Sequence, residues 1–194
     1  DFRNKRRIRV KKLILASKSP RRKELLEILG FDFDIITTEV NELVSENLSP
    51  EELVKTLAYQ KAIGVFESYP DNVVLGSDTI VVVDNEILGK PKNQQEAKEM
   101  ILKMKNREHQ VITGVAILSK EENVIFSNTS VVHFNDIEEE EINKYILTSE
   151  PYDKAGGYAI QGWAARYISA IEGNYYTIMG LPLDKVFETV NKML

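Results

Sequence analysis

Apolar and polar residues follow two periods along this chain, one typical of strands and one typical of helices. Apolar runs and period-two alternation predict strands over residues 13–16, 31–35, 73–83, 87–88, 109–118, 124–134, 166–172 and 175–179. Amphipathic stretches predict helices over residues 20–30, 50–69, 94–104 and 182–193, and a further helix that begins near residue 138. Ser49 and Glu52 have the spacing of a capping box at the second of these helices, and Asn93 with Glu96 caps the third. Because helices and strands intermix throughout, the pattern predicts an α/β or α+β domain around a mixed sheet.

The composition is that of a globular protein. At 194 residues, with 43% hydrophobic and 28% charged residues, the chain can bury one sizeable core, which could be divided into two lobes. It contains no cysteine, which excludes disulfides, thiolate metal sites and cysteine nucleophiles, and its two histidines disfavour a multi-histidine metal site. No apolar run approaches the roughly 20 residues that span a bilayer, and no signal-peptide pattern is present. We therefore expect a cytoplasmic protein with no membrane partner.

The net charge of −5 conceals a basic N-terminal arm over residues 1–12. This arm holds seven of the 25 lysines and arginines but only one of the 30 acidic residues, so the remaining chain is strongly acidic. A basic arm can contact nucleic acid or acidic lipid. Such an arm is more often a disordered or artificially added leader, and we favour that interpretation. Residues 13–194 then form a single acidic domain, which argues against nucleic acid as the main ligand.

The junction between the first predicted strand and the first predicted helix offers a phosphate site. Ser19 can cap the helix and Pro20 suits its first position, which leaves free backbone N–H groups at the helix N-terminus. Two hydroxyls and three cations surround this helix start: Ser17, Ser19, Lys18, Arg21 and Arg22. The alternative is an ordinary capped helix with solvated arginines. We favour phosphate binding, because adjacent arginines add positive charge where the helix dipole is already positive.

Two charged residues interrupt apolar patterns further along the chain. Lys61 lies on a helical row that is otherwise apolar, so it either snorkels to solvent or reaches into a cleft. The pattern alone favours snorkelling. Asp78 interrupts the apolar run 73–83, and because burying a lone carboxylate is costly, it must be paired, metal-bound or protonated.

Together these positions predict a domain that handles nucleotides or polyphosphates. The cationic set is Arg21, Arg22, Lys61 and Lys90, with the Ser17 hydroxyl, and the carboxylate set is Glu42 and Asp78. Cations at a helix N-terminus suit a polyphosphate, and a carboxylate pair suits a hard divalent cation that bridges to phosphate oxygens. The chain has no P-loop motif, and its two histidines make no credible Ser/His/Asp triad.

The same motifs resemble the Maf family of nucleoside triphosphate pyrophosphatases. The opening signature is Ser-Lys-Ser-Pro-Arg-Arg at residues 17–22. The match continues in order through Glu42, Lys61-Ala62, Gly76-Ser77-Asp78-Thr79, Gly89-Lys90-Pro91, Asp153-Lys154-Ala155-Gly156 and Gly180-Leu181-Pro182. The resemblance covers residues 13–194. It implies an elongated mixed sheet in two lobes with flanking helices, similar to the inosine triphosphate pyrophosphatase fold, and a cleft between the lobes.

The resemblance also implies an activity and a set of roles. The activity is hydrolysis of a nucleoside triphosphate between its α and β phosphates with a divalent metal, Mg²⁺ or Mn²⁺. Asp78 is implied as the general base or as a metal ligand, and Glu42 as a second metal ligand. The implied phosphate-binding residues are Ser17, Arg21, Arg22, Lys61 and Lys90. With this role Lys61 becomes a cleft lysine rather than a snorkelling one.

Within the family, residues 158–162 resemble the branch that prefers dTTP and UTP. The amide of Gln161 offers both a donor and an acceptor, which match the O and N–H edge of thymine or uracil. Arg21 and Thr79 match the other specificity positions, and Trp163 either supports this loop or belongs to the core. Two alternatives stay open: the same fold acting on purine or 7-methylguanine nucleotides, and a non-catalytic factor in cell division. The resemblance also implies a homodimer.

Overall fold

The computed structural model describes residues 10–194, so residues 1–9 of the predicted basic arm lie outside the described residues. The strands are β1 (Leu13–Leu15), β2 (Phe33–Ile35), β3 (Val73–Val83), β4 (Glu86–Leu88), β5 (Glu108–Leu118), β6 (Asn123–Phe134) and β7 (Ile168–Glu172). The α-helices are α1 (Pro20–Ile28), α2 (Pro50–Phe66), α3 (Gln94–Met104), α4 (Glu139–Tyr145), α5 (Tyr175–Met179) and α6 (Leu183–Met193). Short 3₁₀ helices are η1 (Glu150–Asp153), η2 (Ala155–Gly157) and η3 (Trp163–Tyr167).

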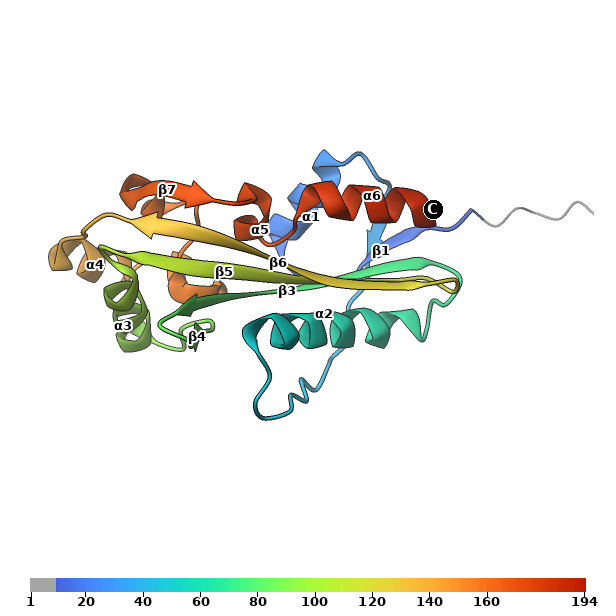
Figure 1. Cartoon of the computed structure of the whole chain (residues 1–194), viewed down its shortest axis with the longest axis horizontal. Coiled ribbons are helices and arrows are strands. Elements are labelled where there is room, and N and C mark those ends of the chain that lie inside the picture. Colours follow the sequence, from blue (N-terminus) through green and yellow to red (C-terminus); the bar gives the residue numbers. More distant parts are fainter. Residues whose placement is uncertain (1–9) are drawn as a thin grey trace, which may run out of the picture.

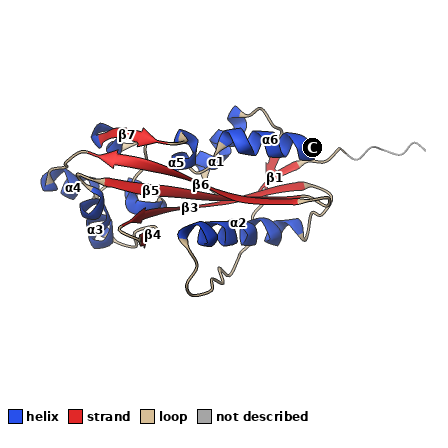
Figure 2. Cartoon of the chain, viewed as in Figure 1, coloured by secondary structure: helices blue, strands red, loops and turns tan. Residues whose placement is uncertain are grey.

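The strands of the described chain form one mixed sheet in the order β2-β1-β3-β5-β6-β7, with β4 paired to β3. Strand β1 runs parallel to β2 and β3, and the other pairs are antiparallel. Three strands, β3, β5 and β6, are 11 or 12 residues long and extend along the whole molecule (Figure 2). At about 3.3 Å per residue, such strands are about 36–40 Å long. The predicted elongated mixed sheet is therefore confirmed.

The long strands carry a different core at each end. At the β1 end, α1 and α6 pack on one face of the sheet and α2 packs on the other (Figure 1). Because strand side chains alternate, Leu13 and Leu15 contribute to the first face while Ile14 contributes to the α2 face. At the other end, α3 and α4 pack on β3, β5 and β6. These two cores correspond to the two predicted lobes.

Helix α2 lies very close to the sheet because two strand residues beneath it are glycines. A Cβ atom added to Gly76 would lie 2.5 Å from the Ala58 carbonyl oxygen, and one added to Gly114 would lie 2.3 Å from the Val54 carbonyl carbon and oxygen. Any larger residue would therefore push the helix backbone away from the sheet. This close approach sets the height at which side chains of α2 meet β3.

One predicted strand is wrong. Residues 175–179 form the short helix α5 rather than a strand. The Asn174 side chain accepts a hydrogen bond from the backbone N–H of Tyr176, which caps the helix, and Gly180 ends it with a φ of 112°. The aromatic and β-branched composition favours a strand locally, but tertiary packing and the cap decide otherwise. The neighbouring strand β7 begins at Ile168, after η3.

No helix among residues 10–194 is long and apolar enough to cross a membrane.

Candidate active site

A cleft of about 710 Å³ lies between the two cores and is lined by residues of both. The N-terminus of α1, the loop before α2, helix α2, strand β3 and the loop after η2 all contribute to its walls. The structure brings together at this cleft every site residue predicted from the sequence: Ser17, Arg21, Arg22, Glu42, Lys61, Asp78, Thr79, Lys90 and Gln161.

The N-terminus of α1 forms one wall of the cleft, with the predicted cap. The Ser19 hydroxyl accepts a hydrogen bond from the backbone N–H of Arg22 at 3.4 Å, and Pro20 occupies the first turn. The Ser17 hydroxyl, which is buried, accepts a hydrogen bond from the backbone N–H of Ser19 at 3.2 Å. The wall therefore combines a positive helix end with two ordered hydroxyls, which suits an anionic group.

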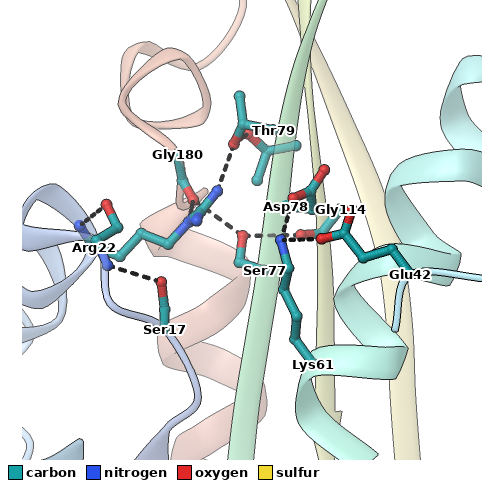
Figure 3. Close-up of polar contacts among 11 residues, drawn as sticks. Ser17, Arg22, Glu42, Lys61, Ser77, Asp78, Thr79, Gly114 and Gly180 are labelled. Atoms are coloured by element: carbon teal, nitrogen blue, oxygen red, sulfur yellow. Dashed lines mark hydrogen bonds and ion pairs between the residues drawn. The ribbon is translucent and has the colours of Figure 1, made fainter. Parts of the chain in front are cut away.

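Lys61 reaches from α2 into the cleft and pairs with both predicted carboxylates (Figure 3). Its ammonium group donates a hydrogen bond to Asp78 and lies 3.7 Å from the Glu42 carboxylate. Asp78 lies opposite Gly114 in the β3–β5 pairing, directly beneath α2, so the close helix packing places the lysine over the aspartate. Asp78 is therefore paired, which is one of the three states that the sequence left open. The snorkelling position first favoured for Lys61 is wrong.

Glu42 lies on the exposed loop that precedes α2, and two contacts hold this loop against the helix. The Gln60 side-chain amide donates a hydrogen bond to the Leu43 carbonyl at 2.6 Å. A Cβ atom at Gly64 would lie only 2.6 Å from the Thr38 hydroxyl, so the glycine lets the loop lie on the helix. These contacts bring Glu42 to the same lysine that Asp78 contacts.

The oxygen donors at this point suit a hard divalent cation. Residues 10–194 contain no group of three or more histidine, aspartate or glutamate side chains arranged to hold a metal. Glu42 and Asp78 supply two carboxylates, and Mg²⁺ commonly binds through one or two carboxylates together with substrate phosphates and water. The residues present therefore fit a metal that binds together with a polyphosphate.

Arg22 links three elements of the cleft wall. Its Nε donates a hydrogen bond to the Gly180 carbonyl at 2.8 Å, and its Nη2 donates one to the Thr79 hydroxyl at 2.9 Å. Burial lowers the pKa of Arg22 below its usual value; the Asp78 carboxylate opposes this effect, and the charge of Arg21 adds to it. Two of its five N–H donors thus bind protein groups, and only the others are available to a phosphate.

Arg21 reaches across the cleft to Asp153, the last residue of η1. Its guanidinium lies 3.5 Å from the Asp153 carboxylate. The neighbouring Lys154 is largely buried and donates hydrogen bonds to the Glu150 carbonyl at 2.7 Å and to the Asp153 carboxylate at 2.6 Å. Arg21 therefore connects the two sides of the cleft by an ion pair.

Contacts with buried aromatic residues anchor the loop that carries Gln161. The Tyr158 hydroxyl hydrogen-bonds the His109 Nε2 at 2.5 Å, and the Tyr145 hydroxyl donates to the Gly157 carbonyl at 2.8 Å. Trp163 stacks on Tyr145 with ring centroids 4.1 Å apart, so this tryptophan both belongs to the core and supports the loop. Gln161 itself is exposed at the cleft.

A comparison with family models matches residues 12–193 to the Maf-like protein family. The chain belongs to this family. A dTTP/UTP pyrophosphatase of Geobacillus sp. is 47% identical to this Maf-like protein over 184 residues, covering 95% of this chain and 99% of the relative. A dTTP/UTP pyrophosphatase of Bacillus cytotoxicus is 49% identical over 177 residues, covering 91% and 93%.

A solved structure supports the predicted fold of this Maf-like protein. The Staphylococcus aureus Ham1 protein matches it with a TM-score of 0.55 at 13% identity, over 94% of this chain and 99% of that chain. At this identity the likeness concerns the fold alone. It agrees with the two-lobed mixed sheet predicted from the sequence.

Three residues that shape the cleft of this Maf-like protein were not predicted from its sequence. Asp153 and Lys154 lie in a motif that matched the family, but no role was predicted for them. His109 is one of the two histidines for which the sequence disfavours a multi-histidine metal site and a catalytic triad, and no other role was predicted for it; in the structure it holds Tyr158. The motif at residues 153–156 was the available signal for the first two residues. No sequence signal pairs His109 with a tyrosine 49 positions away.

Proposed function

We propose that this Maf-like protein hydrolyses dTTP and UTP between the α and β phosphates, releasing the nucleoside monophosphate and pyrophosphate. The observation that carries the proposal is the contact of Lys61 with Asp78 and Glu42 in a cleft whose opposite wall is the N-terminus of α1. The names of the similar proteins, dTTP/UTP pyrophosphatases at 47–49% identity, support the same substrates.

The triphosphate would bind along the cationic wall. The α1 N-terminus with Ser17 provides hydrogen-bond donors, and Arg21, Lys61 and Lys90 provide full positive charges. Charge builds up on the departing pyrophosphate in the transition state, so fixed cations at that end lower the barrier more than they strengthen ground-state binding. We assign these residues, with the donors of Arg22 that remain, to phosphate binding.

Asp78 would supply the carboxylate closest to the reacting phosphate. It would accept the proton of the attacking water or hold the metal that orients this water, and Glu42 would be the second metal ligand. A bound Mg²⁺ or Mn²⁺ would polarise the phosphate oxygens. When a triphosphate occupies the cleft, its oxygens compete with both carboxylates for the Lys61 ammonium, which frees the carboxylates for these tasks.

The base would lie toward the loop of residues 158–162. The Gln161 amide offers one donor and one acceptor to the O4 and N3–H edge of thymine or uracil. Cytosine presents the opposite pattern at these two atoms, so one amide orientation cannot satisfy both bases. Arg21 and Thr79 would complete the specificity set.

The test is a panel of nucleoside triphosphates with Mg²⁺ or Mn²⁺, in which pyrophosphate and orthophosphate are assayed separately. We expect pyrophosphate from dTTP and UTP, little product from dCTP or purine nucleotides, and no product after a chelator removes the metal. Asp78→Asn should lower kcat by about a thousandfold or more, while Asp32→Asn, on the exposed surface, should leave it unchanged. Orthophosphate as the first product, or full activity of Asp78→Asn, would refute the proposal.

We also expect the protein to act in the cytoplasm and as a homodimer. Light scattering after gel filtration measures the mass in solution directly. A mass close to the 22.1 kDa of one chain at every concentration tested would contradict the dimer.

A further inference from the structure

Two threonine hydroxyls connect the cleft to the buried side of the sheet. Thr79 on β3 and Thr113 on β5 are paired across the two strands, and their hydroxyl oxygens lie 2.9 Å apart. Behind them, the Thr113 hydroxyl donates to the Thr177 carbonyl at 2.8 Å. In front, Arg22 donates to the Thr79 hydroxyl at 2.9 Å. Thr113 is fully buried, whereas Thr79 lines the cleft.

The direction of each of these three hydrogen bonds follows from counting the hydrogens of the two hydroxyl groups. A carbonyl oxygen only accepts, so the single hydroxyl hydrogen of Thr113 points to Thr177. Thr113 must then accept the bond that it shares with Thr79, and the single hydrogen of Thr79 points to Thr113. The guanidinium of Arg22 has no acceptor, so its bond uses one lone pair of the Thr79 oxygen.

The Thr79 hydroxyl therefore has one unused lone pair and no free hydrogen for a ligand in the cleft. The backbone leaves the neighbourhood of this oxygen open, because a Cβ atom at Gly180 would lie 3.5 Å from it and the glycine carries none. Any nucleotide atom that approaches the oxygen must be a hydrogen-bond donor. An acceptor placed there would face a lone pair with no hydrogen between them, which is costly inside a cleft.

We propose that Thr113 is a positioning residue for base selection: it holds the Thr79 hydroxyl as an obligate acceptor, which shares the N3–H of thymine or uracil with the amide oxygen of Gln161. The N3 atom of cytosine is itself an acceptor and would be repelled at the same point. The inference rests on the proposed function, in which dTTP and UTP are the substrates. It adds a buried residue, outside the cleft lining, to the residues that decide specificity.

The test compares Thr113→Val with Thr113→Ser. Valine has the shape of threonine without the hydroxyl, so the hydrogen of Thr79 can turn toward the cleft and meet cytosine N3. We expect the ratio of kcat/KM for dTTP to kcat/KM for dCTP to fall by about tenfold or more, the fold-change that corresponds to the free energy of about one hydrogen bond. The change should appear in KM rather than in kcat. Serine keeps the hydroxyl and should keep the ratio.

Ser130→Ala is the matched control, because the Ser130 hydroxyl is likewise buried and donates to the Asn174 carbonyl at 2.8 Å without touching Thr79. It should cost similar stability and leave the ratio unchanged. If Thr113→Val does not fold, Thr113→Ala removes the same hydroxyl with less bulk. A wild-type enzyme with no preference for dTTP over dCTP would refute the proposed function. A wild-type preference that survives in the folded Thr113→Val or Thr113→Ala variant would refute the role of Thr113.

Discussion

Adding one methyl group at Gly114 tests whether the packing of α2 sets the geometry of the site. In Gly114→Ala the new Cβ atom would lie 2.3 Å from the Val54 carbonyl, whereas ordinary contact begins at 3.4 Å. The obstacle is helix backbone, which cannot rotate aside like a side-chain tip. The helix must therefore move outward by about 1 Å or the strand must bend by a similar amount.

Both stability and catalysis should respond to this movement. Overpacking of a dense core costs about 1–3 kcal/mol, which corresponds to a fall in Tm of roughly 2–12 °C for a chain of this size. Lys61 is a residue of α2, and Asp78 on β3 is paired with Gly114 on β5, so the same movement separates the Lys61 ammonium from the Asp78 carboxylate. A misplacement of 1 Å in a catalytic constellation can cost about a hundredfold in rate. We expect kcat/KM for dTTP to fall by about ten- to a hundredfold.

The assay combines thermal unfolding with steady-state pyrophosphate release at a temperature where the variant is folded. Gly89→Ala is the control for stability, because its added methyl group meets no atom within 4 Å. Its Tm should stay within about 1 °C of the wild type. The reasoning would be refuted if Gly114→Ala kept both the Tm and kcat/KM of the wild type. A lower Tm with unchanged kcat/KM would show that the site does not depend on the height of α2.

Two further predictions concern the ion pair between Arg21 and Asp153 and the buried His109. Asp153→Ala removes the carboxylate that lies 3.5 Å from the Arg21 guanidinium, which leaves the guanidinium free for the triphosphate. We expect steady-state kinetics to show a KM for dTTP that is lower by about two- to fivefold. A higher KM would contradict the role of Arg21 in phosphate binding. Burial lowers the pKa of His109 to about 3, so the native state leaves it neutral while the unfolded chain protonates it below about pH 6.5. Stability should therefore fall as the pH drops from about 6.5 to about 3, by up to about 1.4 kcal/mol per pH unit from this residue. Urea unfolding of His109→Phe should show a shallower decline over this range, and an identical decline would exclude the histidine as its cause.

Local chemistry made the helix starts predictable. Ser49 and Glu52 form the capping box expected from their spacing: the Ser49 hydroxyl accepts from the Glu52 N–H, and the Glu52 carboxylate accepts from the Ser49 N–H. Ser19 and Asn93 also cap their helices as predicted. Each of these caps closes within three residues, so no distant contact is needed to define it. The strands with long apolar runs were equally predictable, because burial on both faces leaves little choice of structure.

Contacts between distant segments limited the remaining predictions. Residues 175–179 have the composition of a strand, yet they form a helix because Asn174 caps them and the Thr177 carbonyl accepts a hydrogen bond from Thr113 on β5. The site was predicted as a set of charges, but not which charge pairs with which. The partner of Arg21 is 132 positions away, and no local pattern connects the two.

The pairing of charges in the cleft explains why a lysine on an otherwise apolar helical row can be tolerated. Lys61 is only about a quarter exposed, and Asp78 less than a fifth, so each would be costly to hold in the cleft wall alone. Their contact offsets that cost when no nucleotide is bound, and Glu42 adds a second negative charge nearby. Under the proposed function, a triphosphate with its metal would satisfy the same charges in another combination, with phosphate on the lysine and the metal on the carboxylates. The site would then have two balanced charge arrangements, and nucleotide binding would exchange one for the other without leaving a buried charge unpaired.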